Sequence, residues 1–314
     1  MTRALLDEDD SWTRRPVPRR AGVVRALTGW VVLFGCLGFV VGAAERVTDV
    51  AGLPVSARAV LQAVLLTALV VPAVVVLRRR VDLCSTASMG WGRPRAMPVL
   101  SGALVALATA AAVWGGAWAV GWITVARVDA TQLALFLAVN LVVICLYEAV
   151  PEELALRGYV WTNLRDGWGL PVATAVTTAI FPLGGVVVSS ARWLTMALLG
   201  GEQAPFTAFP AGMDPVVYVV QLVTFGLALV AARRLPVAGA LWAAISFHAL
   251  QLTVTRLVLG GLGWLPSGVS VDLASPDVLA LVLVHIALGG AAFIVLRKRL
   301  ERRRTSSRAP LPIG

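Results

Sequence analysis

Charged residues are scarce in this sequence. They make up 14% of the 314 residues, whereas apolar residues make up 58%, a balance that excludes an ordinary soluble domain of this length. The chain has only two histidines and three cysteines. Cys36, Cys84 and Cys145 fit neither a disulfide framework nor the spacing of a zinc ribbon. The N-terminal stretch carries charges of both signs and is not expected to be a cleaved signal peptide.

Long apolar runs take the place of polar segments. Eight of them reach or approach the ~20 residues that span the hydrocarbon core of a bilayer. They cover residues 27–44, 60–77, 99–125, 133–150, 170–188, 216–232, 237–259 and 278–296. Pro182, Gly184 and Gly185 interrupt the fifth run. The sequence therefore predicts an all-α fold, a polytopic membrane helix bundle of about eight transmembrane helices.

The basic residues predict how this bundle lies in the membrane. If both termini are cytoplasmic, 22 of the 27 arginines and lysines fall on the inner side, as the positive-inside rule favours. We expect basic cytoplasmic tails at 1–25 and 297–314 around a transmembrane domain at 26–296, in a multi-pass protein of the bacterial plasma membrane. The net charge of +10 then reflects topology and contact with membrane lipid. Dispersed arginines without a recognition motif predict no nucleic-acid partner.

Residues 147–158 place three carboxylates and an arginine at the end of an apolar run. Ionisable groups inside a bilayer cost about 2.5–3.5 kcal/mol on insertion scales, so those that remain usually face the bundle interior. Glu148 and Glu152 are four residues apart and share one helix face, as do Glu153 and Arg157. We expect a structural Glu153–Arg157 ion pair and a free pair of carboxylates. Alternatively Pro151 begins a separate surface helix, because proline followed by acidic residues is a common helix start.

The two histidines lie in the last two apolar runs. His248 has Gln251 and Arg256 near the same helix face. His285 stands alone and is more typical of a hydrogen bond between helices than of a metal ligand. The same interpretation is favoured for Asn140 in the fourth run.

The stretch from Glu152 to Gly158 reads Glu-Glu-Leu-Ala-Leu-Arg-Gly. It resembles the Glu-Glu-x-x-x-Arg-Gly signature of the CPBP family, which comprises CAAX prenyl endopeptidases and bacterial bacteriocin-processing and immunity proteins. The resemblance covers a core of about 133–256. It implies an intramembrane metallo-endopeptidase fold in which Glu152 activates water, with histidines and an Asn or Asp completing the site. It also implies zinc or another divalent metal held by Glu152 and His248, and a membrane-embedded or lipidated peptide as partner.

Two later motifs of the family are incomplete in this chain. A Phe-x-x-x-His motif would begin at Phe181, but position 185 is glycine. A His-x-x-x-Asn/Asp motif would begin at His248, but position 252 is leucine. Neither side chain can bind a metal or hold a proton. Gln251 could partly replace the missing amide, and His285 could replace the histidine only if its helix packs against the site.

Three functional hypotheses follow from these residues. The first is an intramembrane endopeptidase with retained or weakened activity, and the second is a non-catalytic relative that binds membrane proteins or peptides, as an immunity or regulatory protein would. The third is a proton-coupled transporter, which lacks visible repeat symmetry and is ranked last. In the first two, Glu148, Glu152 and His248 are expected to face one polar chamber open to the cytoplasmic side.

Overall fold

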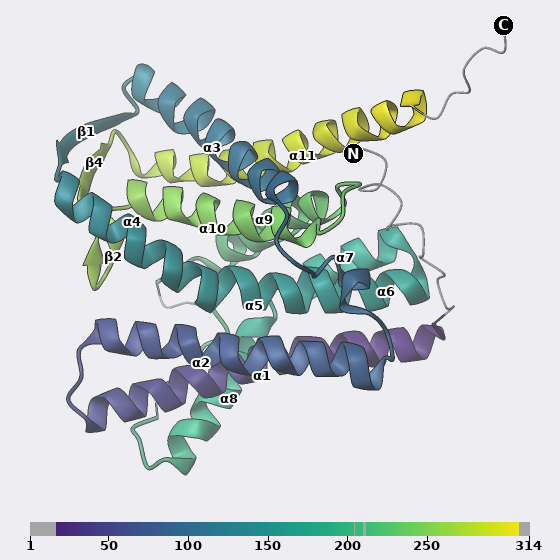
Figure 1. Ribbon diagram of the computed structural model, residues 1–314. Helices are drawn as coiled ribbons and strands as arrows, with labels where there is room; N and C mark the ends of the chain where they lie inside the picture. Colours follow the sequence, from purple (N-terminus) through teal and green to yellow (C-terminus); the bar gives the residue numbers. More distant parts are fainter. Residues whose placement is uncertain (1–16, 204, 210–211, 308–314) are drawn as a thin grey trace, which may run out of the picture.

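The computed structural model describes residues 17–203, 205–209 and 212–307, and these residues fold into a helical bundle (Figure 1). Parts of the predicted tails, among them Arg3, Arg14, Arg15 and Arg308, lie outside the described residues. The helices are α1 (Arg19–Val50), α2 (Val55–Val76), α3 (Ala96–Ala119), α4 (Ala130–Ile144), α5 (Val150–Glu152), α6 (Trp161–Trp168), α7 (Leu170–Ile180), α8 (Gly184–Leu198), α9 (Pro215–Arg233), α10 (Leu241–Val258) and α11 (Leu281–Ser307).

The number of membrane spans agrees with the sequence. Seven helical segments of the described chain are long and apolar enough to cross a membrane, and α7 with α8 makes an eighth that is bent by 46°. The bend lies at Pro182, where the sequence predicted an interruption, because proline cannot continue the hydrogen bonding of α7. The protein is thus a polytopic all-α membrane protein, and α4 to α6 form one segment, Ala130–Trp168.

Short strands lie at one end of the bundle, where none was expected. β1 (Ile123–Val128) pairs in antiparallel fashion with β4 (Val269–Leu273), and β2 (Gly261–Leu262) pairs with β3 (Leu265–Pro266). The third apolar run, 99–125, was therefore predicted too long, since its last residues form β1. Gly121, with a φ of +76°, ends the helical path before the strand.

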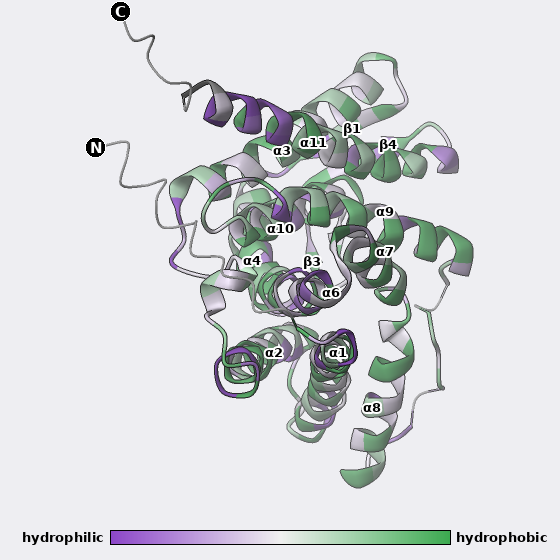
Figure 2. Cartoon of the chain, turned by 90° about the vertical axis from the view of Figure 1, so that its right-hand side faces the viewer, coloured by the Kyte–Doolittle hydropathy of each residue, from purple (hydrophilic) through white to green (hydrophobic). Residues whose placement is uncertain are grey.

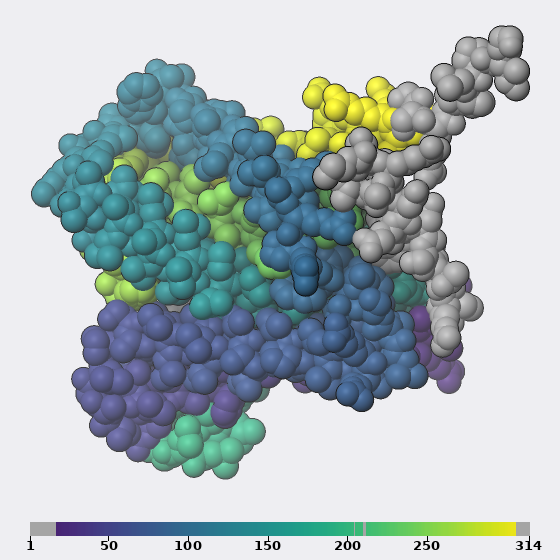
Figure 3. Space-filling view, in the orientation of Figure 1, coloured from purple at the N-terminus to yellow at the C-terminus, as the bar shows by residue number. Residues whose placement is uncertain are grey.

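The helices α1 and α2 form a slab along one side of the bundle, with the segment from α4 to α6 beside it (Figures 1 and 3). On the other side of that segment lie α3, α9, α10 and α11. Small residues permit the closest approaches: a Cβ at Gly38 would overlap the backbone of α8, and one at Gly102 would overlap α10. Such contacts hold membrane helices together where no hydrophobic driving force exists.

The end of the bundle where α1 begins and α11 ends is the more polar one, and hydrophilic residues gather on α11 there (Figure 2). Both helices reach into the segments predicted as tails, because the long side chains of arginine extend toward water while their helix continues. α8 likewise extends ten residues beyond the end of the fifth predicted apolar run at residue 188.

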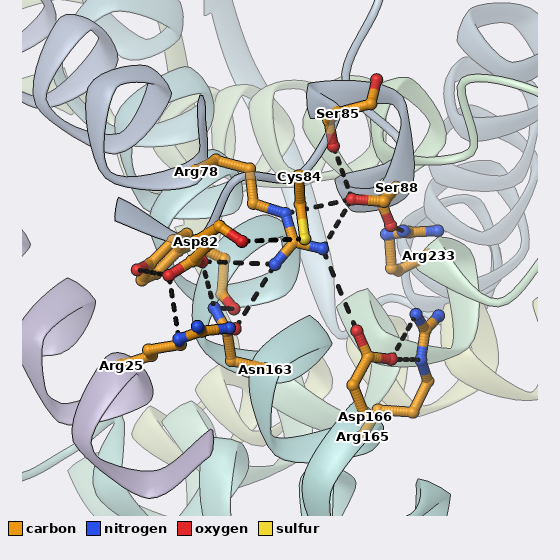
Figure 4. A network of polar contacts seen from close by, with 11 residues as sticks. Arg25, Arg78, Asp82, Cys84, Ser85, Ser88, Asn163, Arg165, Asp166 and Arg233 are labelled. Carbon is orange, nitrogen blue, oxygen red and sulfur yellow. Dashed lines mark hydrogen bonds and ion pairs between the residues drawn. The ribbon is translucent and has the colours of Figure 1, made fainter. Parts of the chain in front are cut away.

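A buried polar cluster fastens the connection after α2 to this end of the bundle (Figure 4). Asp82 contacts Arg25 of α1 at 3.1 Å and Arg78 at 3.3 Å. Tyr159 and Asn163 of the segment Ala130–Trp168 donate to the same carboxylate over 3.2 and 3.4 Å. The backbone turns sharply at the next residue, Leu83, which has a φ of +55°. The cluster therefore joins three segments that are distant in sequence.

The orientation of the bundle is open to a labelling test. In a variant without native cysteines, Asp272→Cys in β4 should react with an impermeant thiol reagent in intact cells, and Arg93→Cys should react only after lysis. The reason is the positive-inside rule applied to the 22 inner basic residues. If only Arg93→Cys is labelled in intact cells, the orientation is the opposite of the predicted one.

Candidate functional site

The charged segment lies on a continuous helix and not at the start of a new one. The chain stays helical through Pro151, with π-helical stretches at Cys145–Ala149 and Glu153–Val160 on either side. These wider turns accommodate the proline, which has no N–H to donate. The alternative of a surface helix that restarts at Pro151 is therefore wrong.

Glu153 and Arg157 form the predicted ion pair, with 3.2 Å between Nη1 and Oε1. Both side chains are fully buried, and the guanidinium lies over the ring of Phe181 at 4.6 Å. The same carboxylate oxygen contacts Nδ1 of His248 on α10 at 3.0 Å, a contact that the sequence did not predict. Glu153 thus fixes the ring of His248 in the way that a carboxylate orients many functional histidines.

Glu148 is not free for chemistry, contrary to the sequence-based expectation. Its carboxylate pairs with Arg256 of α10, with 2.5 Å between Oε1 and Nη2. Arg256 also donates to Asn140 over 3.2 Å, and Asn140 donates to Thr253 over 2.9 Å. The predicted role of Asn140 in a bond between helices is confirmed. These contacts fasten α4 to α10, and they leave Glu152 as the carboxylate without an ion pair among the described contacts of this segment.

A chamber of about 400 Å³ brings the predicted site residues together. Glu148, Glu152, His248 and Gln251 all line it, and Phe225 packs edge-on against His248 at 4.8 Å between ring centroids. The rest of the wall comes from α1, α8, α9 and the connection between α8 and α9, with Leu252 of α10, Phe181 between α7 and α8 and Ile286 of α11. The chamber wall is more apolar than polar, and its polar side chains lie on both sides: besides the motif residues they are Ser189, Arg192, Thr207, Tyr218 and Gln221.

The opening of the chamber toward the cytoplasmic side stays a prediction, and the lining residues give the position of the chamber along the bundle. Along α1 the lining residues are Phe34 at the middle of the helix, and Leu37 and Val41 in the half away from Arg19. Residues 207–209 of the α8–α9 connection close part of the chamber. Arg46, near the end of α1, donates to the carbonyl of Leu199 at the end of α8 over 3.1 Å. The chamber thus extends toward the end of the bundle opposite the described chain ends.

Gly185 and Leu252 lie on the chamber wall, at the positions where the family pattern has His and Asn or Asp. A Cβ at Gly185 would overlap the carbonyl oxygen of Ala208. Ser189, one turn further along α8, donates to the carbonyl of Thr207. The α8–α9 connection therefore occupies the space that a side chain at position 185 would need.

Neither suggested substitute supplies the missing groups in full. Gln251 lines the chamber, and its amide nitrogen donates to Thr255 over 3.0 Å. His285 lies outside the chamber wall, and its Nε2 contacts the carbonyl oxygen of Ala106 on α3 at 3.1 Å. The predicted interhelical role of His285 fits this contact. The chamber wall contains one histidine, His248. The suggestion that His285 completes the site is therefore wrong.

The side chains around the chamber do not fit a catalytic zinc site, which takes three protein ligands. No group of three His, Cys, Asp or Glu side chains within ligand distance of a common point is found in the described parts of the chain. His248 has one ring nitrogen committed to Glu153, and Glu148 is paired with Arg256. A metal on Glu152 and His248 stays a prediction from the resemblance, and no chemical step is derived through it.

Comparison with known proteins agrees with the resemblance seen in the sequence. Residues 131–254 match the family model of the type II CAAX prenyl endopeptidase Rce1-like proteins. The matched region runs from α4 to α10 and includes Glu152, Gly185 and His248. No curated protein and no solved structure matches the chain.

Proposed function

From the premise that this multi-pass membrane protein carries an Rce1-like, CAAX protease-like domain at residues 131–254, we propose that its chamber binds a lipidated or membrane-embedded peptide without hydrolysing it. The description of the matched family is type II CAAX prenyl endopeptidase Rce1-like. A peptide with a prenylated cysteine is accordingly the first ligand to test. The bacterial plasma membrane is the proposed location.

The proposal that hydrolysis is lost rests on one observation: Gly185 and Leu252 occupy the chamber wall where the family pattern has His and Asn or Asp. An endopeptidase must stabilise the charge that develops on the attacked carbonyl, and donors for this role are placed in advance. Glycine and leucine side chains offer none. The Ala208 carbonyl beside Gly185 is a further acceptor, and it would repel an oxyanion that formed there.

The remaining polar side chains retain part of an acid–base apparatus. Glu152 lines the chamber and has no ion pair among the described contacts, so its carboxylate is available to accept a proton from water there. His248, oriented by Glu153 through Nδ1, has Nε2 left to donate or accept. Weak hydrolysis is therefore the nearest alternative, and a proton-coupled transporter remains the third because these groups could also relay protons.

The proposal is tested with the purified full-length protein in liposomes and a fluorescent farnesylated peptide that ends in a CAAX sequence. We expect saturable binding to the wild type, and a cleavage rate that Glu152→Gln leaves unchanged. Leu252→Trp should weaken binding at least tenfold, because the indole would fill part of the 400 Å³ chamber.

Two matched controls separate the chamber from the surface. Leu227→Trp on α9 adds the same ring at a side chain that is 48% exposed, and Glu301→Gln removes a carboxylate on α11. Neither should affect binding. Cleavage that Glu152→Gln abolishes and Glu301→Gln preserves would show an active endopeptidase, and absence of saturable binding would refute the proposal.

A further inference from the structure

An apolar slot of about 320 Å³ lies between α1, α6 and α7, apart from the chamber. Its walls include Leu27 of α1, Trp168 of α6 and Val172 of α7. These three side chains are 38–49% exposed, and every residue that lines the slot is apolar. In a membrane-spanning protein such a slot is filled by hydrocarbon, since water gains no hydrogen bonds there.

Two arginines lie directly above this slot on α1. Arg19 precedes the lining residues Val23 and Ala26 by four and seven residues, and Arg20 precedes Val23 and Leu27 by three and seven. These spacings place both arginines on the helix face that forms the slot. Both are exposed, and the beginning of α1 that carries them lies at the end of the bundle that faces the viewer in Figure 2.

Trp168 is fixed between the arginines and the slot. Its indole N–H donates to the carbonyl of Arg19 over 3.1 Å, and the Arg19 guanidinium lies 5.2 Å from the ring centroid. A tryptophan with one polar contact and one apolar face is typical of the membrane interface. This contact marks the depth at which headgroups meet acyl chains.

The length of the slot corresponds to one leaflet. Its lining residues on α7 run from Val172 to Ile180. These nine residues extend over roughly 13 Å at 1.5 Å per residue. Half of the hydrocarbon core is about 15 Å. The slot therefore ends near the middle of the bilayer, where the chain bends at Pro182.

We propose that the slot is a binding site for one anionic phospholipid of the leaflet at this end of the bundle, with an acyl chain between α1, α6 and α7 and the phosphate at Arg19 and Arg20. A zwitterionic phospholipid offers the same chain but a headgroup that also carries a positive charge. Charge complementarity at the mouth therefore selects the anionic lipid, as basic residues near the cytoplasmic leaflet commonly do.

Fluorescence quenching tests the site in the full-length protein. The probes are phosphatidylglycerol and phosphatidylcholine brominated on the acyl chain, titrated into liposomes that hold the wild type or Trp168→Phe. The difference between the two proteins isolates the quenching of Trp168. We expect phosphatidylglycerol to reach half-quenching at about twenty-five-fold lower mole fraction, since each of the two arginines contributes roughly fivefold.

Paired variants decide what causes the preference. Arg19→Gln with Arg20→Gln should abolish it, whereas Arg299→Gln with Arg302→Gln on α11, which removes the same net charge, should preserve it. Val176→Phe should prevent quenching of Trp168 by filling the slot, and Val295→Phe at a side chain 49% exposed should not.

Three results would overturn the proposal. Equal quenching by both lipids would show that the slot does not select the anionic lipid. Equal effects of the two arginine pairs would show that the preference comes from the net charge of the protein and not from Arg19 and Arg20. Quenching that begins only after deletion of residues 2–16 would show that the N-terminal segment occupies the slot.

Discussion

Arg157→Ala is expected to reduce the amount of folded protein in the membrane severely. The side chain is fully buried, and its removal leaves the Glu153 carboxylate without its cation in the bundle interior. Breaking a buried pair in this way costs about 3–5 kcal/mol, which is a large share of the 5–15 kcal/mol that stabilises a typical protein. The contact with Phe181 is lost as well. Protein level in membranes and the midpoint of thermal unfolding in detergent measure the effect.

The double variant Glu153→Gln with Arg157→Met separates charge from packing. It removes both charges and keeps most of the volume, so it should recover much of the stability that Arg157→Ala loses. His248 loses its charged partner in this variant, and any peptide hydrolysis that depends on the ring should stay low despite the recovered fold. Wild-type stability of Arg157→Ala would contradict the buried pair, because an exposed pair contributes about 0–1 kcal/mol.

Asp82→Ala is expected to have the second largest effect. Its carboxylate accepts from Tyr159 and Asn163 and pairs with Arg25 and Arg78. The side chain of Arg78 is 2% exposed, so it would keep a buried charge without its closest acid. We expect a loss of about 3 kcal/mol or more. The connection that follows α2 should then become sensitive to protease, because the cluster that holds it would come apart.

Asp82→Asn and Asp49→Ala are the matched variants for this prediction. The asparagine keeps an acceptor for Tyr159 but no charge for the arginines, so its unfolding midpoint should lie between those of the wild type and Asp82→Ala. Asp49 pairs with Arg58 at the other end of the bundle and its side chain is 51% exposed. Its replacement should change the stability by less than about 1 kcal/mol. Equal effects at Asp82 and Asp49 would show that burial of the cluster is unimportant.

Among the contacts around Glu153, those within one helix can be predicted from the sequence, and those between distant helices cannot. The Glu153–Arg157 pair follows from a spacing of four on one helix, which needs no knowledge of other elements. The bond from Glu153 to His248 spans 95 residues, and the pair of Glu148 with Arg256 spans 108. No local spacing predicts either contact. Of the two carboxylates expected to be free, Glu148 is therefore paired with Arg256 of α10, and Glu152 is not.

The sequence by itself determined the all-α membrane class and the motif helix. Apolar runs of bilayer length must form helices, since each backbone group needs a partner inside hydrocarbon. Only the tertiary structure decided that His285 contacts α3, that the Ala208 carbonyl stands against Gly185 and that Asp82 gathers three segments. The physical reason is that side-chain partners inside a bundle depend on the rotation and depth of each helix. Contacts of small residues and long-range hydrogen bonds fix these quantities, and hydrophobicity alone leaves them undetermined.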